Sequence, residues 1–343
     1  MIVNSDERQW SWMDEGLNTF CQYMAEQAWD NNYPSQRGPA HKIVDYMKMP
    51  KDQLEPIMTN SENIINFGPN AYAKPATALN ILRETVMGRE LFDYAFKEYA
   101  KRWAFKHPTP ADLFRTLEDA SAVDLDWFWR GWFFGTDPVD ISLNDVRYYR
   151  LDSKNQTTEN IENKKAYDKD LYNIGRERNR KEGIKFAVEQ DTSLLDFYNK
   201  FNRFEVSKSA DQDFQNYMSS LSPDERKLYE SKKNFYELDF SNEGGLVMPI
   251  IIEWTFKDGT KEVDRIPAYI WRKDENKVTK VFAKDKEVVS IQLDPYRETA
   301  DIDEQNNSWP RKSQPSRFEL FKQQQAPRGS STGSNPMQQS RQR

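Results

Sequence analysis

Apolar residues recur every three or four positions over residues 1–135, which is the spacing of amphipathic helices. The segment from Trp10 to Ala28 follows this spacing and predicts a helix whose apolar stripe faces a core. Pro75 is a typical first residue of a second helix, which Gly88 ends. Three more helices are predicted over 91–103, 109–117 and 125–134. Residues 1–140 are therefore expected to form a helical lobe.

The spacing of apolar residues changes to two from residue 235 onward, which is typical of β-strands. Residues 250–256 and 262–271 flank a Lys-Asp-Gly-Thr turn and predict a β-hairpin. Further strands are expected at 277–283 and 288–293. This part of the chain therefore predicts a small antiparallel β domain.

The segment between these parts has a mixed pattern. A strand is predicted over 141–151, and the charged stretch 153–183 has the composition of a solvated helix or a loop. A helix is predicted over 191–201, and the Ser222-Pro223 pair predicts the start of another. These expectations describe an α+β fold with a mixed connecting segment. The predicted boundaries are 1–140 for the helical lobe, 141–234 for the connecting segment, 235–308 for the β domain and 309–343 for a tail.

Composition adds three constraints. The chain has 49 Lys and Arg against 55 Asp and Glu, a net charge of −6, so it lacks the overall basic charge of a nucleic-acid-binding protein. The tail 309–343 is the exception, because it holds seven Lys and Arg against the single acidic residue Glu319, and we expect it to be disordered. One cysteine, Cys21, excludes an intrachain disulfide, and no apolar run is long enough to cross a membrane.

Few residues carry recognisable chemistry. His41 and His107 occur in loop contexts, and the chain has no serine-nucleophile, cysteine-nucleophile or phosphate-binding motif. The Asp301-x-Asp303 segment lacks the glycine and the final glutamate of a calcium loop, so we interpret it as a surface turn. Hydrolysis by serine or cysteine and nucleotide chemistry therefore lose support.

Glu15 is the candidate that the helical pattern isolates. It lies on the opposite side of the first predicted helix from the stripe of Met13 and Leu17. On geometry alone, a solvated glutamate is the favoured interpretation, because most glutamates are exposed. Trp12 and Tyr23 lie beside this polar face and favour a covered cleft.

Two segments of the predicted lobe resemble the M1 aminopeptidase family of zinc metallopeptidases. Residues 12–17, Trp-Met-Asp-Glu-Gly-Leu, are similar to the family's Trp-Leu-Asn/Asp-Glu-Gly-Phe segment. Residues 70–79, which contain Tyr-Ala-Lys-Pro, are similar to its Tyr-x-Lys-Gly/Pro segment. Later family elements have counterparts at 88–92, 112–114 and 129–138. The resemblance covers residues 1 to about 140, and its specificity lies in the order of the motifs.

This resemblance implies a thermolysin-like helical lobe of the gluzincin type and a zinc-dependent peptidase activity that acts on peptide or protein substrates. Glu15 would be the third zinc ligand. Tyr72 would be the catalytic hydrogen-bond donor to the oxyanion that forms when the peptide bond is attacked. Asp14 and Thr19 would support the ligand without binding the metal.

The family takes its first two zinc ligands and its general base from a His-Glu-x-x-His helix, whose second histidine precedes the third ligand by about 18 residues. Met1 lies closer to Glu15 than this spacing requires. We therefore expect the chain to be the C-terminal portion of a longer enzyme and to be inactive alone. The alternative is a noncatalytic scaffold that binds a protein partner through aromatic surfaces. A His-Glu-x-x-His sequence in frame upstream would distinguish the enzyme from the scaffold.

Overall fold

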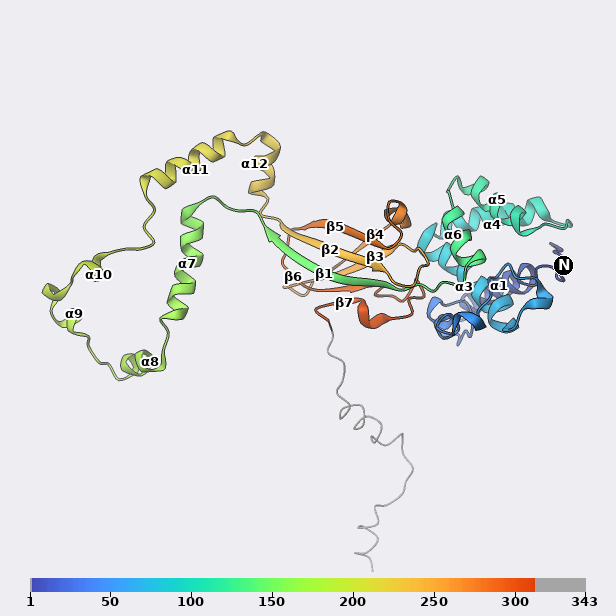
Figure 1. Ribbon diagram of the computed structural model, residues 1–343, viewed down its shortest axis with the longest axis horizontal. Coiled ribbons are helices and arrows are strands. Elements are labelled where there is room, and N and C mark those ends of the chain that lie inside the picture. Colours follow the sequence, from blue (N-terminus) through green and yellow to red (C-terminus); the bar gives the residue numbers. More distant parts are fainter. Residues whose placement is uncertain (1, 312–343) are drawn as a thin grey trace, which may run out of the picture.

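The computed structural model describes residues 2–311. A helical lobe lies at one end, a β region with two antiparallel sheets follows, and a string of exposed helices extends from the far end of that region (Figure 1). The α+β class that the sequence predicts is confirmed. Of the predicted basic tail, residues 312–343 lie outside the described part, so its disorder stays a prediction.

The helical lobe contains the predicted helices, joined by short turns. Within residues 2–311, no helix has both the length and the apolar composition that crossing a bilayer requires. The helical elements of the lobe are α1 (Trp12–Trp29), η1 (Ala40–Lys42), α2 (Val44–Met47), η2 (Lys51–Gln53), η3 (Ser61–Asn63), η4 (Gly68–Ala73), α3 (Lys74–Ile81), η5 (Leu82–Val86), α4 (Arg89–Trp103), α5 (Pro110–Ser121) and α6 (Asp126–Phe134).

Helix α1 is buried over a wider arc than its apolar stripe predicts. Met13 and Phe20 are buried as expected, but Trp12 is only 1% exposed and packs against Phe114 and Phe133 in the core. The prediction that Trp12 covers a polar cleft beside Glu15 is therefore wrong. Neighbouring helices pack against α1 on two sides, whereas the single apolar stripe in the sequence predicts packing on one side only.

The second contact of α1 is made at Gly16, where α1 crosses the start of α3. A Cβ atom at this position would lie 2.6 Å from Cγ of Pro75 and 3.2 Å from the carbonyl oxygen of Ala71. Only glycine fits at this distance without moving one of the helices. Gly16 therefore sets the separation between α1, which carries Glu15, and the segment that carries Tyr72.

The β region consists of two sheets with the strand orders β1-β2-β5 and β4-β3-β6-β7, and all pairs within them are antiparallel. Tyr236, Trp254 and Phe282 pack between the sheets. The strands are β1 (Ile141–Arg150), β2 (Asn234–Asn242), β3 (Ile250–Phe256), β4 (Lys261–Ile266), β5 (Lys277–Lys284), β6 (Val288–Leu293) and β7 (Ser308–Trp309).

The helical lobe and the β region share one core. The indole nitrogen of Trp132 in α6 donates to the Met248 sulfur at 3.4 Å, and both side chains are fully buried. On another part of the junction, the Thr85 hydroxyl donates to the Glu298 carboxylate at 3.0 Å, which also pairs with Arg265 at 2.7 Å. Apolar packing and a hydrogen bond to a carboxylate therefore hold the two parts together.

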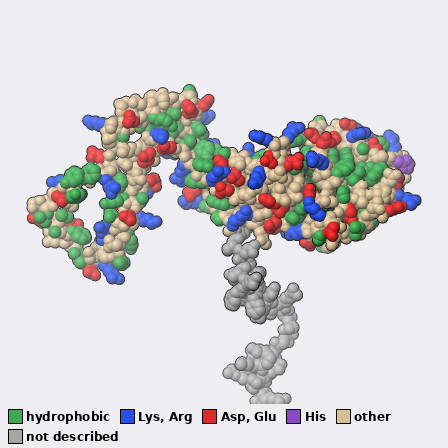
Figure 2. Space-filling model, viewed as in Figure 1, with side chains coloured by type: hydrophobic (Ala, Val, Ile, Leu, Met, Phe, Trp, Pro, Cys, Tyr) green, Lys and Arg blue, Asp and Glu red, His purple; other side chains and the backbone are tan. Residues whose placement is uncertain are grey.

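The exposed helices form an excursion between β1 and β2, which are neighbours in the same sheet. Arg150 at the end of β1 pairs with Asn234 at the start of β2, and the helices leave and return at this point (Figure 1). The helices of the excursion contain no buried residue, and apolar and charged side chains alternate over their surface (Figure 2). They are α7 (Gln156–Asp170), α8 (Ile174–Lys181), α9 (Ala187–Gln190), η6 (Thr192–Leu194), α10 (Phe197–Lys200), α11 (Lys208–Ser220) and α12 (Pro223–Glu230).

Three local expectations need correction. The helix predicted over 191–201 is two short pieces, because Asp191 and Asp196 each cap a new turn. Strand β4 ends at Ile266, since Pro267 has no N–H to continue the ladder, and a 3₁₀ turn, η7 (Ala268–Arg272), follows. Asp301 is 7% exposed, so the predicted surface turn is limited to η8 (Glu304–Asn306).

The predicted domain boundaries stay a prediction. The structure shows only that residues 141–150 of the predicted connecting segment lie in a sheet, as the strand pattern there indicates.

Candidate functional site

Glu15 and Tyr72, the residues with the most specific predicted functions, lie next to each other. Glu15 is in the first turn of α1, and Tyr72 is in the π-helical segment η4, which packs against α1. The Glu15 carboxylate lies close enough to the Tyr72 hydroxyl to raise the pKa of that phenol. Both side chains are half-buried, so solvent reaches them. The fold thus brings a carboxylate and a phenol together from two separate segments.

The protonation state of Tyr72 follows from this contact. The neighbouring Glu15 carboxylate raises the pKa of the Tyr72 phenol, and burial acts in the same direction. The nearby Arg37 guanidinium opposes them. A raised pKa keeps the hydroxyl protonated near neutral pH. A protonated phenol can donate to negative charge that develops on a substrate oxygen.

Arg37 is a residue of this site that the sequence analysis missed. Its guanidinium carbon lies 4.6 Å from the centroid of the Tyr72 ring, and the Phe67 ring packs against the same ring at a steep angle. The loop of Arg37 packs on α1 through Gly38, where φ is +105° and a Cβ atom would lie 2.4 Å from the Tyr23 ring. The Arg-Gly-Pro sequence marks a turn but gives no sign of which side chain the arginine contacts.

Asp14 is oriented by neighbours other than Glu15. It accepts a hydrogen bond from the Asn18 amide at 2.7 Å, and the Glu7 carboxyl group lies nearby. The charge of Asp14 raises the pKa of Glu7. Its predicted support of Glu15 stays a prediction.

Beside Glu15 is a surface cavity of about 340 Å³. Its lining contains three glutamates and one arginine, so its charge favours a cation. The residues around it are Glu7, Arg8, Ser11, Glu15, Ser61, Glu62 and Phe67.

Thr19 is one helical turn beyond Glu15 and is 6% exposed. It borders a second cavity, of about 370 Å³, whose lining also includes Arg37. The structure thus buries this polar residue of α1. Its predicted support of the metal ligand stays untested.

Lys74, two residues after Tyr72, has a buried ammonium group. It is 3% exposed, and its Nζ donates to the carbonyl oxygen of Gly135 at 3.2 Å, which connects the start of α3 to the end of α6. Burial lowers the pKa of Lys74 to about 8, and the charge of Asp137 opposes this effect only in part. Sequence reasoning quotes this lysine within the Tyr-Ala-Lys-Pro segment but gives no reason to expect it inside the core.

The free energy of unfolding is expected to rise as the pH is raised from about 8 to 10.5. Over this range Lys74 has lost its proton in the folded chain but keeps it in the unfolded chain, so deprotonation favours folding. The shift is worth about 3 kcal/mol. Urea unfolding of wild type and Lys74→Met across this range measures it as the difference between the two curves. Parallel pH dependences would show that Lys74 does not titrate in this way.

The described residues do not complete a zinc site around Glu15. A catalytic zinc ion takes three protein ligands, and Glu15 offers one. Within residues 2–311, the single group of three His, Cys, Asp or Glu side chains close enough to share an ion consists of Glu118, Asp124 and Asp126. These residues therefore place no second or third ligand beside Glu15, and its function as a zinc ligand stays a prediction.

Comparison with known proteins supports the resemblance of the helical lobe. Residues 2–132 match the family model of the peptidase family M1 domain. Among solved structures, the chain is similar to aminopeptidase A of Legionella pneumophila, crystallised with aspartic acid, with 12% identity and a TM-score of 0.45. That match covers 88% of this chain and 24% of the other, so the chain spans about a quarter of the length of that protein. No curated protein sequence matches.

Proposed function

Since residues 2–132 are related to the M1 peptidases, we propose that the chain is part of a zinc-dependent aminopeptidase that hydrolyses N-terminal peptide bonds. The contact between Glu15 and Tyr72 carries this proposal. Both residues lie in the matched segment, and each has the side chain that the proposed chemistry needs. The substrates are peptides or proteins with a free amino end.

Glu15 is one zinc ligand in this proposal. Zinc, when bound, supplies a hydroxide at neutral pH and polarises the scissile carbonyl group. Tyr72, held by η4 beside Glu15 and kept protonated, donates to the oxygen that becomes negative in the transition state. Arg37 holds the Tyr72 ring from one face and so positions its hydroxyl.

The other two ligands and the general base belong to a His-Glu-x-x-His helix in the same proposal. This motif does not occur in the 343 residues, so it would be supplied by sequence upstream of Glu15 in a longer protein. The chain alone then has one metal ligand of three, and we propose that it is inactive alone.

The 343-residue chain is expected to bind less than stoichiometric zinc and to release no arylamine from amino-acid arylamides, because one carboxylate cannot replace a three-ligand site with a base. The test compares this chain with the same chain extended upstream in its reading frame. Metal content after dialysis and arylamide hydrolysis are measured for both.

Stoichiometric zinc and turnover in the extended protein alone would support the proposal. Turnover by the chain alone would contradict the proposal that two zinc ligands and the general base lie outside this chain. An extended protein without His-Glu-x-x-His and without zinc would favour the noncatalytic scaffold.

A further inference from the structure

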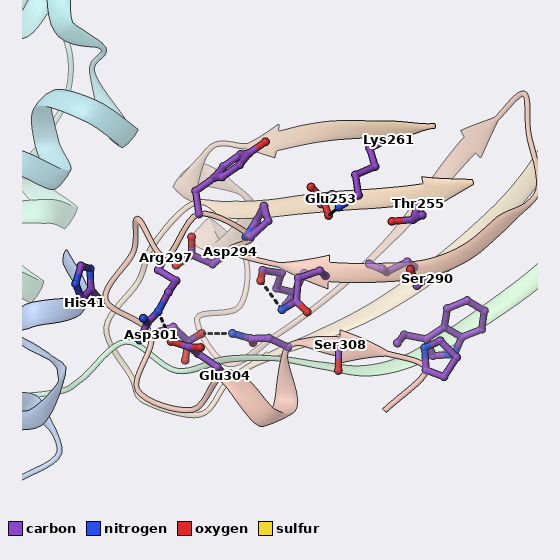
Figure 3. Close-up of a pocket in the computed structure, with 18 of the residues that line it drawn as sticks. His41, Glu253, Thr255, Lys261, Ser290, Asp294, Arg297, Asp301, Glu304 and Ser308 are labelled. Carbon is purple, nitrogen blue, oxygen red and sulfur yellow. Dashed lines mark hydrogen bonds and ion pairs between the residues drawn. The ribbon is translucent and has the colours of Figure 1, made fainter. Parts of the chain in front are cut away.

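The largest cavity in the described part of the chain, of about 590 Å³, lies on the outer face of the four-stranded sheet (Figure 3). The lysine and the arginine of its lining both contact an acidic neighbour. The Lys261 ammonium contacts the Glu253 carboxylate at 2.8 Å. The Arg297 guanidinium contacts the Glu304 carboxylate at 2.6 Å. A basic side chain without such a partner lies instead beside Tyr72, in the helical lobe.

Arg37 is this unpaired basic side chain. Among the described residues its guanidinium has no ion pair and no hydrogen bond, and it lies over the Tyr72 ring at 4.6 Å. Arg8, which lines the cavity beside Glu15, contacts the Glu62 carboxylate at 3.2 Å. Arg37 is exposed, so its N–H groups are open to a ligand. A guanidinium presents paired donors that match the two oxygens of a carboxylate.

The two surface cavities of the candidate site follow each other along helix α1. Glu15 lines the first cavity, and Thr19, one turn further along the helix, lines the second. Gln22 and Glu26 continue this row and also line the second cavity. Residues three or four apart share one face of a helix, so a ligand can extend from Glu15 along this face. Arg37 lines the second cavity as well.

The Tyr72 ring contacts one residue of each cavity. Phe67 of the first cavity packs against this ring with a centroid distance of 6.0 Å, and Arg37 of the second lies over it. The three glutamates of the first cavity favour a cation. In the second cavity the Glu26 carboxylate accepts a hydrogen bond from Gln22 at 2.8 Å, whereas the Arg37 guanidinium is open to an anion. The two ends of the site therefore favour opposite charges.

We propose that Arg37 binds the C-terminal carboxylate of the substrate, so that the site prefers peptides of two or three residues. Such a peptide carries an ammonium group at one end and a carboxylate at the other, which matches the two cavities. It spans about 7 to 10 Å, and α1 rises about 10 Å from Glu15 to Gln22. This inference rests on the proposed function, because it names the substrate of the same site.

The first test needs no turnover and uses the 343-residue chain. NMR follows the Nε–H signal of Arg37, which is identified by its absence from Arg37→Met. Trialanine at about 20 mM is expected to shift this signal, whereas trialanine amide, which lacks the carboxylate, is not. The signal of Arg115, an exposed arginine of α5, is the control and should not move. An Arg37 signal that trialanine leaves unchanged would overturn the inference.

The second test measures kcat/KM in the longer protein that contains the His-Glu-x-x-His helix. Wild type is expected to prefer trialanine over trialanine amide about tenfold, because only the free acid pairs with the guanidinium. Arg37→Met should remove this preference. Arg37→Lys keeps the charge but loses the paired donors, and it should retain part of the preference. Arg115→Met is the matched control and should retain all of it.

An acidic side chain next to the scissile bond offers the same carboxylate, so Ala-Glu-amide and Ala-Gln-amide are compared as well. A preference for the glutamate peptide that needs Arg37, without one for trialanine, would overturn the assignment to the C-terminal carboxylate. Equal trialanine preferences in wild type and Arg37→Met would also overturn it, while turnover itself would still support the proposed function. A longer protein that hydrolyses no peptide would contradict the proposed function, and the NMR result would then decide on Arg37.

Discussion

Glu15→Gln, made in the longer protein that contains the His-Glu-x-x-His helix, is expected to abolish stoichiometric zinc binding and with it peptidase activity. A neutral amide oxygen is a much weaker zinc ligand than a carboxylate. The fold should tolerate the change, because Glu15 is half-buried and glutamine has the same size and shape. We therefore expect the free energy of unfolding of the metal-free protein to change by less than about 0.5 kcal/mol.

The matched control for this variant is Glu26→Gln, at the other end of the same helix, where the carboxylate contacts Gln22. Zinc content after dialysis, arylamide hydrolysis and urea unfolding are measured for wild type and both variants. Full zinc occupancy with normal turnover in Glu15→Gln would show that Glu15 is not a ligand.

Tyr72→Phe in the same protein is expected to lower kcat about 100-fold to 1,000-fold with little change in KM. The hydroxyl would act on charge that is present mainly in the transition state, so its loss leaves substrate binding almost intact. Zinc content should also stay the same, which separates this variant from Glu15→Gln. Tyr94→Phe, which removes a hydroxyl from an exposed position on α4, is the control.

Steady-state kinetics at several pH values measures both parameters for Tyr72→Phe. A fall in kcat/KM caused by KM alone would assign Tyr72 to substrate binding. An unchanged kcat would leave it as a structural tyrosine that contacts Glu15.

The helices of the lobe could be predicted because their apolar spacing is regular, but the contacts that build the site could not. Gly16 shows the limit most clearly. The sequence places a glycine after Glu15, whereas the 2.6 Å approach to Pro75 depends on a helix that starts only at Lys74. Lys74 is similar, because its partner Gly135 follows a different helix. Local pattern carries no information about which distant segment will cover a given face.

In the β region too, features formed by residues close in sequence could be predicted, and features formed by distant segments could not. The turn at 257–260 predicts the hairpin of β3 and β4, since its ends are close in sequence. The outer face of that sheet becomes a cavity only because the loops before β7 fold over it and place Ser308 beside β6. The pattern of the strands does not show which distant loops will fold over them, so this cavity could not be predicted.

The excursion between β1 and β2 affects how the sheet assembles. The paired residues Arg150 and Asn234 are separated by residues 151–233, so this strand pair closes a long loop. Relative to a tight hairpin turn, the entropy of closing such a loop costs about 3 kcal/mol. The pair therefore cannot act as a local nucleus, and β2 gains from pairing first with β5, which follows it more closely along the chain. Doubling the length of the excursion would add only about 0.6 kcal/mol, so its length can vary with little effect on the sheet.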